Sequence, residues 1–420
     1  MKFISTRSSA PAVSASIAIR AGLAPDGGLY IPETFPQFAP NDFAGVHGLP
    51  DIASVLLTPF FAGDPLADHL VNICASAFDF PVPVQAVADK LSVLELFHGP
   101  TAAFKDFGAR FLANCTDAME DQAAKQTILV ATSGDTGGAV GCAFADSSNA
   151  RVVILYPRGR VSPFQEQQLT CWGDNVTALE VDGDFDACQD LVKQAFAPQT
   201  AKHLGSANSI NIARLLPQMS YYAQSALAHF TATGEPANFV IPTGNMGNGM
   251  ACLWARACGL PIGQVVFASN ANRTLFDFFA EGVLRENTSI PTLANAMDVG
   301  NPSNFERYGK LLPSQTANTA CYMTRDPQIE HRIRQDHFNY GQTWCPHTAC
   351  AAESWQQLPL SQRDQHWFLV ATAHPYKFRE VVEPLITQPI LAAPALQEIL
   401  NLPSQKTQIA AQLSALLAHI

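Results

Sequence analysis

The chain of 420 residues has no apolar run near the roughly 18 residues that a membrane-spanning helix needs. Small apolar residues do follow two basic ones at the start of the sequence, but serines interrupt them and Arg20 closes them early, so we expect no signal peptide. The ten cysteines form no C-x-x-C pair and no regular framework. Zinc and disulfide scaffolds are therefore not expected, and a reduced, cytoplasmic chain is favoured.

Positive charge is also scarce, since 25 Lys and Arg stand against 36 Asp and Glu, a net charge of −11. This balance argues against nonspecific binding to nucleic acid or to an anionic membrane. An anionic ligand would have to be held by local dipoles and a few chosen cations. With 47% hydrophobic and 15% charged residues, the composition is that of a globular protein with about two or three domains.

Strand-like and helix-like segments alternate from residue 91 onward, after a turn-rich lead-in. Such alternation favours parallel sheets with helices on both faces, which is an α/β fold. Helical patterns cover residues 211–230 and 247–258, and residues 396–420 read as one or two amphipathic helices. The buried strands are predicted at residues 91–97, 127–131, 151–156, 176–181, 239–242, 265–268 and 367–372.

A lysine stands where one of these strands gives way to a helix. Residues 97–112 read FHGPTAAFKDFGARFL, with turn chemistry after the strand and helical spacing of Phe104, Phe107, Phe111 and Leu112. Lys105 then lies near a helix start just past a strand end, where ligands collect in open α/β sheets. Partial desolvation there favours the neutral amine and a Schiff-base nucleophile. The alternative is an ordinary surface lysine with its stem packed on the helix.

Two glycine-rich turns also follow strands and open helices. They read TSGDTGG at residues 132–138 and TGNMGNG at residues 243–249. Glycines allow close backbone approach, and a helix N-terminus offers unpaired N–H groups to an anion. Neither turn matches the Walker loop or G-x-G-x-x-G, and tight packing of strand on helix is the alternative for each. An amine nucleophile with two anion sites suits pyridoxal phosphate and an anionic amino-acid substrate.

Beyond these separate features, the chain resembles a known family over nearly its whole length. The matching blocks occur in the family's order: MKFISTR, GLAPDGGLYIPE, FHGPTAAFKDFG, ATSGDTGGA, NSINIARLLPQMSYY, PTGNMGN, AMDVGNPSN, CPHTA and ATAHPYKF. By these blocks it resembles the threonine synthases, fold-type II pyridoxal-phosphate enzymes, in the form without the regulatory extension of plant members. The resemblance implies two open, mostly parallel sheets flanked by helices. It also implies an N-terminal domain at residues 1–90, a small domain at 91–225 and a large domain at 226–420.

The resemblance further implies the roles of particular residues. Lys105 would form the Schiff base and act as the catalytic base, and Thr372 would bind the pyridine nitrogen. Asp135 would approach both the cofactor ring hydroxyl and the substrate carboxylate, which requires a proton if the two oxygens share a hydrogen bond. The phosphate cradle of the cofactor would be Gly244, Asn245, Met246, Gly247 and Asn248. The substrate would be held by Ser133, Asp135, Thr136, Ser209, Asn211 and Arg214.

The implied reaction converts O-phospho-L-homoserine and water into L-threonine and phosphate. Two alternatives stay open: a related phospho-lyase that releases phosphate and a 2-keto acid, and a catalytically silent metabolite-binding paralogue. Loss of Lys105, Arg214 or a glycine loop would mark the paralogue, and all are present. The expected partner is a small-molecule substrate, without nucleic acid or membrane, and the expected assembly is a monomer or homodimer.

The other polar residues of these blocks are expected to be structural. The spacing of His98, His347 and His374 fits no metal-ligand motif, so no metal is expected and structural or supporting roles are favoured. Lys377 and Arg379 could contribute positive electrostatic potential near Thr372, but a solvated helix face is the simpler interpretation.

Overall fold

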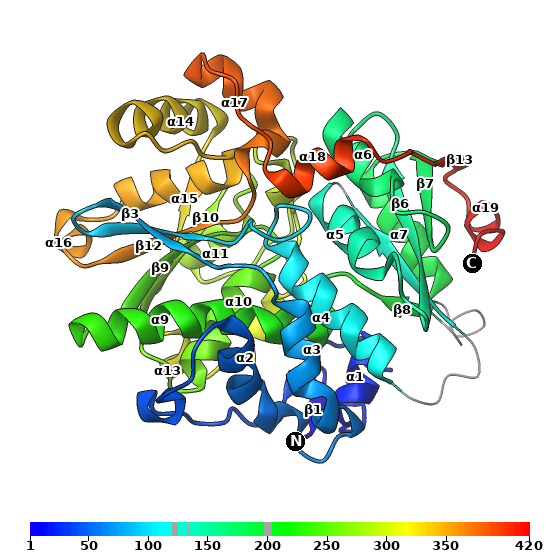
Figure 1. Ribbon diagram of the computed structural model, residues 1–420, viewed down its shortest axis with the longest axis horizontal. Coiled ribbons are helices and arrows are strands. Elements are labelled where there is room, and N and C mark those ends of the chain that lie inside the picture. The colour runs from blue at the N-terminus through cyan, green and yellow to red at the C-terminus, as the bar shows by residue number, and fades with distance from the viewer. Residues whose placement is uncertain (120–124, 133, 197–203) are drawn as a thin grey trace.

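Two sheets built mainly from parallel strands form the centre of the computed structural model, which describes residues 1–119, 125–132, 134–196 and 204–420 (Figure 1). Within these residues the larger sheet has six strands in the order β11-β10-β9-β12-β4-β3, with only the edge pair β3 and β4 antiparallel. The strands are β3 (Val84–Ala88), β4 (Leu91–Glu95), β9 (Ala237–Pro242), β10 (Ile262–Ser269), β11 (Thr319–Met323) and β12 (Trp367–Ala371).

The smaller sheet has five strands in the described part of the chain, all parallel, in the order β13-β7-β6-β5-β8. They are β5 (Gln126–Ala131), β6 (Ala150–Pro157), β7 (Val176–Asp182), β8 (Leu204–Ser206) and β13 (Thr407–Ala410). The predicted α/β fold with two mainly parallel sheets is thus confirmed.

Side chains alternate between the two faces of each strand, and helices cover both faces of the larger sheet. Phe239 and Ile241 face the core that includes α9 (Met219–Thr233) and α10 (Gly247–Ala257). Val240 between them faces the core that includes α14 (Asp326–Tyr340), α15 (Pro346–Gln356) and α17 (Arg379–Ile386). This alternation explains why the strand reads as a continuous apolar run in the sequence.

The two sheets share one core. Val130 and Ile154 of the smaller sheet belong to the same cluster of buried residues as Phe239. The helices α4 (Lys105–Ala118) and α5 (Asp135–Phe144) contribute to this cluster, whereas α7 (Phe185–Ala195) packs on the opposite face of the smaller sheet. The strand ends of both sheets therefore reach one interior region.

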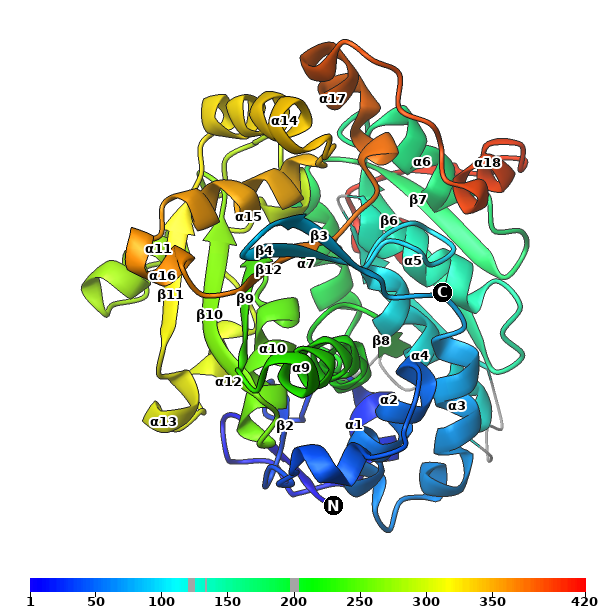
Figure 2. The ribbon, with the colours of Figure 1, turned by 60° about the vertical axis from the view of Figure 1, so that its left-hand side comes forward.

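The N-terminal segment packs against α4 and α9 at one side of this core. Its elements are β1 (Phe3–Ser5), β2 (Tyr30–Pro32), α1 (Ala15–Ala21), α2 (Leu49–Leu57) and α3 (Leu70–Ala77), drawn in blue in Figure 2 beside α4 and α9. Phe107 of α4 has its ring 6.0 Å from that of Phe78, 4.8 Å from that of Phe80 and 4.9 Å from that of Tyr221 on α9. The helix that begins with Lys105 is thereby fixed on both sides.

The C-terminal segment differs from its prediction. It runs from α17 through α18 (Pro394–Leu400) to β13 and α19 (Leu413–Leu417), and Figure 1 shows it in red, crossing to the edge of the smaller sheet. Helices were expected throughout residues 396–420, but β13 is a strand. Ile409 is its one buried residue, so the sequence carries no apolar alternation that would indicate a strand.

The helical prediction for residues 211–230 was also too simple. The structure breaks the segment into α8 (Ile212–Leu215), the 3₁₀ turn η5 (Leu216–Gln218) and α9, with Pro217 at the break. Proline lacks the N–H that would continue the helix. The remaining helices are η1 (Pro40–Phe43), η2 (Thr58–Phe61), η3 (Pro65–His69), α6 (Pro163–Thr170), α11 (Thr274–Glu281), η6 (Asn295–Met297), α12 (Phe305–Tyr308), α13 (Pro313–Thr316), α16 (Leu360–Arg363) and η7 (Pro375–Phe378).

The domain boundaries at residues 90 and 225 stay a prediction. The two sheets do not follow these boundaries. The strands β3 and β4 come before residue 225 but lie in the larger sheet, and β13 comes after it but lies in the smaller sheet. Among the described residues, no helix is both long and apolar enough to cross a membrane. All ten cysteines are free thiols.

Removal of the Phe107 ring tests the packing that holds α4. Phe107 is fully buried, so Phe107→Ala should lower the free energy of unfolding by about 3 to 5 kcal/mol, measured by urea denaturation. Phe338→Ala is the matched control, because Phe338 is 86% exposed and its loss should change stability by about 0.5 kcal/mol or less. Equal losses in the two variants would contradict this packing.

Candidate active site

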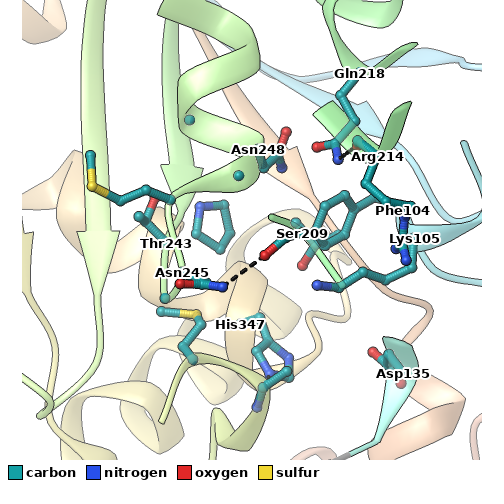
Figure 3. Close-up of a pocket in the computed structure, with 18 residues that line it drawn as sticks. Phe104, Lys105, Asp135, Ser209, Arg214, Gln218, Thr243, Asn245, Asn248 and His347 are labelled. Carbon is teal, nitrogen blue, oxygen red and sulfur yellow. Dashed lines mark hydrogen bonds between the residues drawn. The ribbon is translucent and has the colours of Figure 1, made fainter. Parts of the chain in front are cut away.

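Most of the predicted site residues meet in a pocket of about 70 Å³ between the two sheets (Figure 3). Residues that directly follow β9 and β12 line it, as do the first residues of α4 and α5. This is the carboxyl edge of the parallel strands, where open α/β sheets bind ligands. The predicted residues that line it are Lys105, Asp135, Ser209, Arg214, Gly244, Asn245, Met246, Gly247, Asn248 and Thr372.

Backbone contacts fix the position of Lys105. The Phe104 N–H donates to the Thr372 carbonyl at 2.8 Å, and the His374 N–H donates to the Ala102 carbonyl at 3.0 Å. The loop before Lys105 is thus joined to the segment that follows β12. Lys105 begins α4, and its side chain points into the pocket (Figure 3).

The surroundings of Lys105 favour its neutral form. Burial and the nearby Arg214 guanidinium lower the pKa of the Lys105 amine to about 8, against an opposing contribution from Asp135. The Nζ atom lies 4.8 Å from the centre of the Phe104 ring. Roughly a tenth of the amine is therefore unprotonated at pH 7, against less than about a thousandth for an ordinary lysine, and the neutral amine is the form that a nucleophile or a general base requires.

The second glycine-rich turn forms one wall of the pocket. Met246 has φ of 61°, in the left-handed region, and α10 begins at the next residue. Gly244 lies so close to the backbone of Met297 that a Cβ on Gly244 would come within 2.7 Å of the Met297 Cα. A side chain at residue 244 is excluded, because neither backbone can move aside easily.

Asn248 presents an unused donor in this wall. The hydroxyls of Tyr221 and Tyr222 donate to its Oδ1 at 2.5 Å and 2.8 Å. Because Oδ1 is held by two donors, the amide orientation is fixed, and the buried Nδ2 is left without a partner in the described structure. This free N–H group suits an anionic ligand. The sequence did not indicate the role of the two tyrosines.

Ser209 and Asn245 join the glycine-rich wall to the segment before α8. Asn245 Nδ2 donates to Ser209 Oγ at 2.7 Å, the contact dashed in Figure 3. Asn304 donates to the Asn245 carbonyl at 3.0 Å, and Arg307 donates to the Ser209 carbonyl at 3.2 Å. Two predicted anion-binding segments thus share one hydrogen-bond network. Asn304 and Arg307 were not singled out from the sequence.

Arg214 and Asn211 occupy different positions, although one short motif contains both. Arg214 lines the pocket, is buried, and donates from Nη1 to the Ala207 carbonyl. Asn211 lies outside the pocket lining. Its Nδ2 donates to the carbonyls of Ile19 and Ser206, and its Oδ1 accepts the Ala213 N–H at the start of α8. The substrate contact predicted for Asn211 stays a prediction, while its observed contacts cap a helix.

The first glycine-rich turn places Asp135 at the N-terminus of α5. Thr132 Oγ1 accepts the N–H groups of Gly134 and Gly137, at 3.0 Å and 3.1 Å, and so shapes the turn. Thr136 lines a wider adjoining cavity of about 490 Å³ that also reaches Lys105. Ser133, predicted to bind substrate, lies outside the described residues.

Lys377 differs from its interpretation, and His347 has a structural contact next to the pocket. Lys377, interpreted from the sequence as part of a solvated helix face, is fully buried, and its Nζ lies 2.9 Å from Asp135 Oδ1. His347 lines the pocket, and its Nε2 accepts the Ala296 N–H at 3.1 Å. Burial lowers the pKa of His347 to about 4, so the ring is neutral at neutral pH. Within the described ranges, no cluster of three or more His, Cys, Asp or Glu side chains could hold a metal ion.

Comparisons with known proteins identify the family. Residues 84–362 match the model described as "Pyridoxal-phosphate dependent enzyme", and residues 2–78 match "Threonine synthase N terminus". The chain is 38% identical to a threonine synthase of Serratia marcescens, over 96% of this chain and 95% of that protein. It is 37% identical to a threonine synthase of Escherichia coli (strain K12), over 99% and 98%. The chain belongs to the threonine synthase family.

A solved structure agrees with this assignment. The crystal structure of a pyridoxal-phosphate-bound threonine synthase from Brucella melitensis has a TM-score of 0.92 and 32% identity, over 100% of this chain and 98% of that one. The predicted cofactor class, pyridoxal phosphate, is confirmed by the family model and by this relative.

The pocket of this chain fits that cofactor. Pyridoxal phosphate needs an amine for its aldehyde and a cradle for its phosphate. Lys105 supplies the amine, and the wall at residues 244–248 supplies a close backbone with a buried, unpaired Asn248 Nδ2. Thr372 lines the same pocket and offers a hydroxyl.

A pair of glycine variants tests the cradle. Gly244→Ala should weaken retention of pyridoxal phosphate by about tenfold or more, because the new Cβ would collide with the Met297 backbone. Gly309→Ala is the matched control, since its Cβ would have no neighbour closer than 3.8 Å and Gly309 lies outside the pocket lining. Equilibrium dialysis of each purified variant against the cofactor measures the difference. Equal affinities would show that the close approach at Gly244 does not shape the cradle.

Proposed function

We propose that the protein converts O-phospho-L-homoserine and water into L-threonine and phosphate in the cytoplasm. The observation that carries the proposal is that one pocket combines the Lys105 amine, a glycine-rich cradle and a buried Arg214 beside Ser209. The amine and the cradle serve the cofactor. Arg214 and Ser209 remain for a second anion, which is the phosphate of the substrate in this proposal. The full-length relatives named threonine synthase support it.

Lys105 is assigned the proton transfers. When bound, pyridoxal phosphate supplies an electron sink for the negative charge that develops at the substrate carbons. With a pKa of about 8, the Lys105 amine can take the proton from Cα and return a proton near neutral pH. A single base can serve both Cα and Cβ, because these atoms are adjacent in the substrate.

Arg214 and Ser209 are assigned to the leaving phosphate. A guanidinium binds phosphate through two parallel hydrogen bonds, and it stays charged although burial lowers the pKa of Arg214 to about 10. Ser209 is held by Asn245 and can contact the same group. Holding the phosphate on one side leaves Cβ open to the water that completes the reaction.

Thr372 is assigned to the pyridine nitrogen of the cofactor. A hydroxyl there does not stabilise a protonated ring as a carboxylate would, so the ring is a weaker electron sink. Charged groups of the protein near Lys105 must then contribute more to stabilising the negative charge that develops on the substrate. Assembly as a monomer or homodimer is retained as a prediction.

Product analysis tests the reaction. With O-phospho-L-homoserine, the purified protein should form threonine in step with phosphate, and Lys105→Ala should form neither while still folding. Phosphate accompanied by 2-oxobutanoate would replace the proposal with the phospho-lyase reaction. No phosphate release would indicate another substrate or a binding role, and turnover by Lys105→Ala would contradict the assignment of Lys105.

The phosphate assignment has a separate test. Arg214→Ala should raise the KM for O-phospho-L-homoserine by roughly 10- to 100-fold, because a hydrogen bond to a charged group contributes about 1.5 to 3 kcal/mol. Its affinity for pyridoxal phosphate should change much less. Steady-state kinetics and cofactor dialysis measure the two quantities. An unchanged KM would place the substrate phosphate elsewhere.

A further inference from the structure

Lys377 is a buried cation next to the pocket with no contact to solvent. It lies in η7, after β12, and is 0% exposed. Its Nζ donates to the Thr101 carbonyl at 2.9 Å and lies 2.9 Å from Asp135 Oδ1. A lysine is seldom buried without a partner of opposite charge, because the ammonium loses its hydration. The burial of Lys377 therefore depends on Asp135.

Asp135 connects this cation to the pocket. It is 7% exposed and lines the pocket, whereas Lys377 stands behind it. The contact of Asp135 Oδ1 with Lys377 has the distance of an ion pair but lacks hydrogen-bond geometry. Burial by itself raises the pKa of Asp135, yet the Lys377 ammonium, together with His347 and Lys105, brings the pKa below its usual value. The carboxylate thus keeps its charge and an oxygen for a further donor.

The ion pair also joins the two sheets next to Lys105. Asp135 follows β5 of the smaller sheet, and Lys377 follows β12 of the larger one. Thr101, whose carbonyl accepts from Lys377, belongs to the loop that leads to Lys105, and its N–H and hydroxyl donate to Asp106 at 3.0 Å and 2.5 Å. A displacement of Lys377 would therefore disturb both the Asp135 carboxylate and the loop before Lys105.

The charges that face Lys105 come from several elements. Arg214 on α8 lowers the pKa of Lys105, and Asp135 on α5 raises it. His347 on α15 is neutral, and Asp106, next to Lys105 on α4, is fully buried and bonded to Thr101. Asp135 is the one carboxylate in the described lining of the smaller pocket, and Glu286 and Asp298 line the adjoining cavity that also reaches Lys105. Of these three carboxylates, Asp135 is the one that raises the pKa of Lys105.

We propose that Lys377 is a positioning residue that holds Asp135 as a fixed carboxylate beside Lys105 and thereby sets the protonation of the Lys105 nitrogen. Without this cation, an Asp135 carboxylate near the ring hydroxyl of the cofactor would place two oxygen anions together. The ammonium lets a carboxylate occupy a position where, otherwise, a neutral group would be needed. The inference rests on the proposed use of Lys105 and pyridoxal phosphate.

The first experiment titrates the holoenzyme and follows the absorbance of the cofactor bound to Lys105. Lys377→Met should lower the pH midpoint by about one unit or more, because Asp135 without its cation takes up a proton and no longer attracts the proton on the Lys105 nitrogen. Lys377→Arg keeps the charge and should stay near the wild-type midpoint. Arg379→Met is the matched control: it removes a cation two residues away whose side chain is partly exposed.

A merely structural lysine would leave this midpoint unchanged. The proposal is overturned if Lys377→Met titrates like the wild type, or if Arg379→Met shifts the midpoint equally. The pH midpoint of each variant does not depend on which product forms. Failure of the product assay and failure of this inference are therefore separate results.

A double-mutant cycle tests the pair independently. Asp135→Asn and Lys377→Met should each reduce the folding equilibrium constant of the holoenzyme, because each leaves a buried charge without its partner. The double variant should lose at least about tenfold less than the product of the two single losses. This charge-neutral double variant also covers the case in which Lys377→Met alone does not fold. Multiplicative losses, or a double variant that fails to fold, would contradict the coupling.

Discussion

A buried ion pair between the two sheets is the constraint on which the pocket depends. Lys377 and Asp135 come from strand ends of different sheets, and both are withdrawn from water. An ammonium or a carboxylate alone in this interior would cost several kcal/mol, so each requires the other. Their approach to 2.9 Å therefore fixes the strand end that carries Thr372 against the helix that begins at Asp135. Lys105 lies between these two segments.

The opposite wall of the pocket is fixed by hydrogen bonds and not by an ion pair. Tyr221 and Tyr222 hold Asn248, and Asn304 with Arg307 hold the backbone at Ser209 and Asn245. The residues that hold this wall do not themselves line the pocket: Tyr221, Tyr222, Asn304 and Arg307. They leave a few donors unused, and such preorganised donors bind an anion without having to reorder. We therefore propose that one side of the pocket tunes the charge of Lys105 and that the other presents donors to phosphate.

The sequence predicted the local features of this arrangement well. Buried strands appear as short apolar runs, and glycine-rich turns after strands indicated both loops that line the pocket, because strand, turn and helix are encoded by adjacent residues. The edge strand β13 was missed because Ile409 alone is buried in it.

The failures at the site share a cause. Lys377 looks like a solvated lysine at a helix start, since its partner Asp135 is distant in the sequence and only the meeting of two sheets brings them together. The contacts of Asn211 were missed for the same reason: its substrate contact stays a prediction, and the hydrogen bonds of its amide to Ile19 and Ser206 follow only from the folded structure. Tertiary burial decides such roles, and no local pattern reports it.

Burial beside Arg214 should make Lys105 a weakly basic amine, and a titration of Lys105 itself measures this. Cofactor-free protein would be exposed briefly to acetic anhydride at a series of pH values, and the modification of Lys105 would be read by peptide mass spectrometry, with exposed lysines as an internal reference. Half-maximal labelling is expected at a pH of about 8. A midpoint at the ordinary lysine value of 10.5 would contradict it, because the amine would then be neither desolvated nor influenced by Arg214.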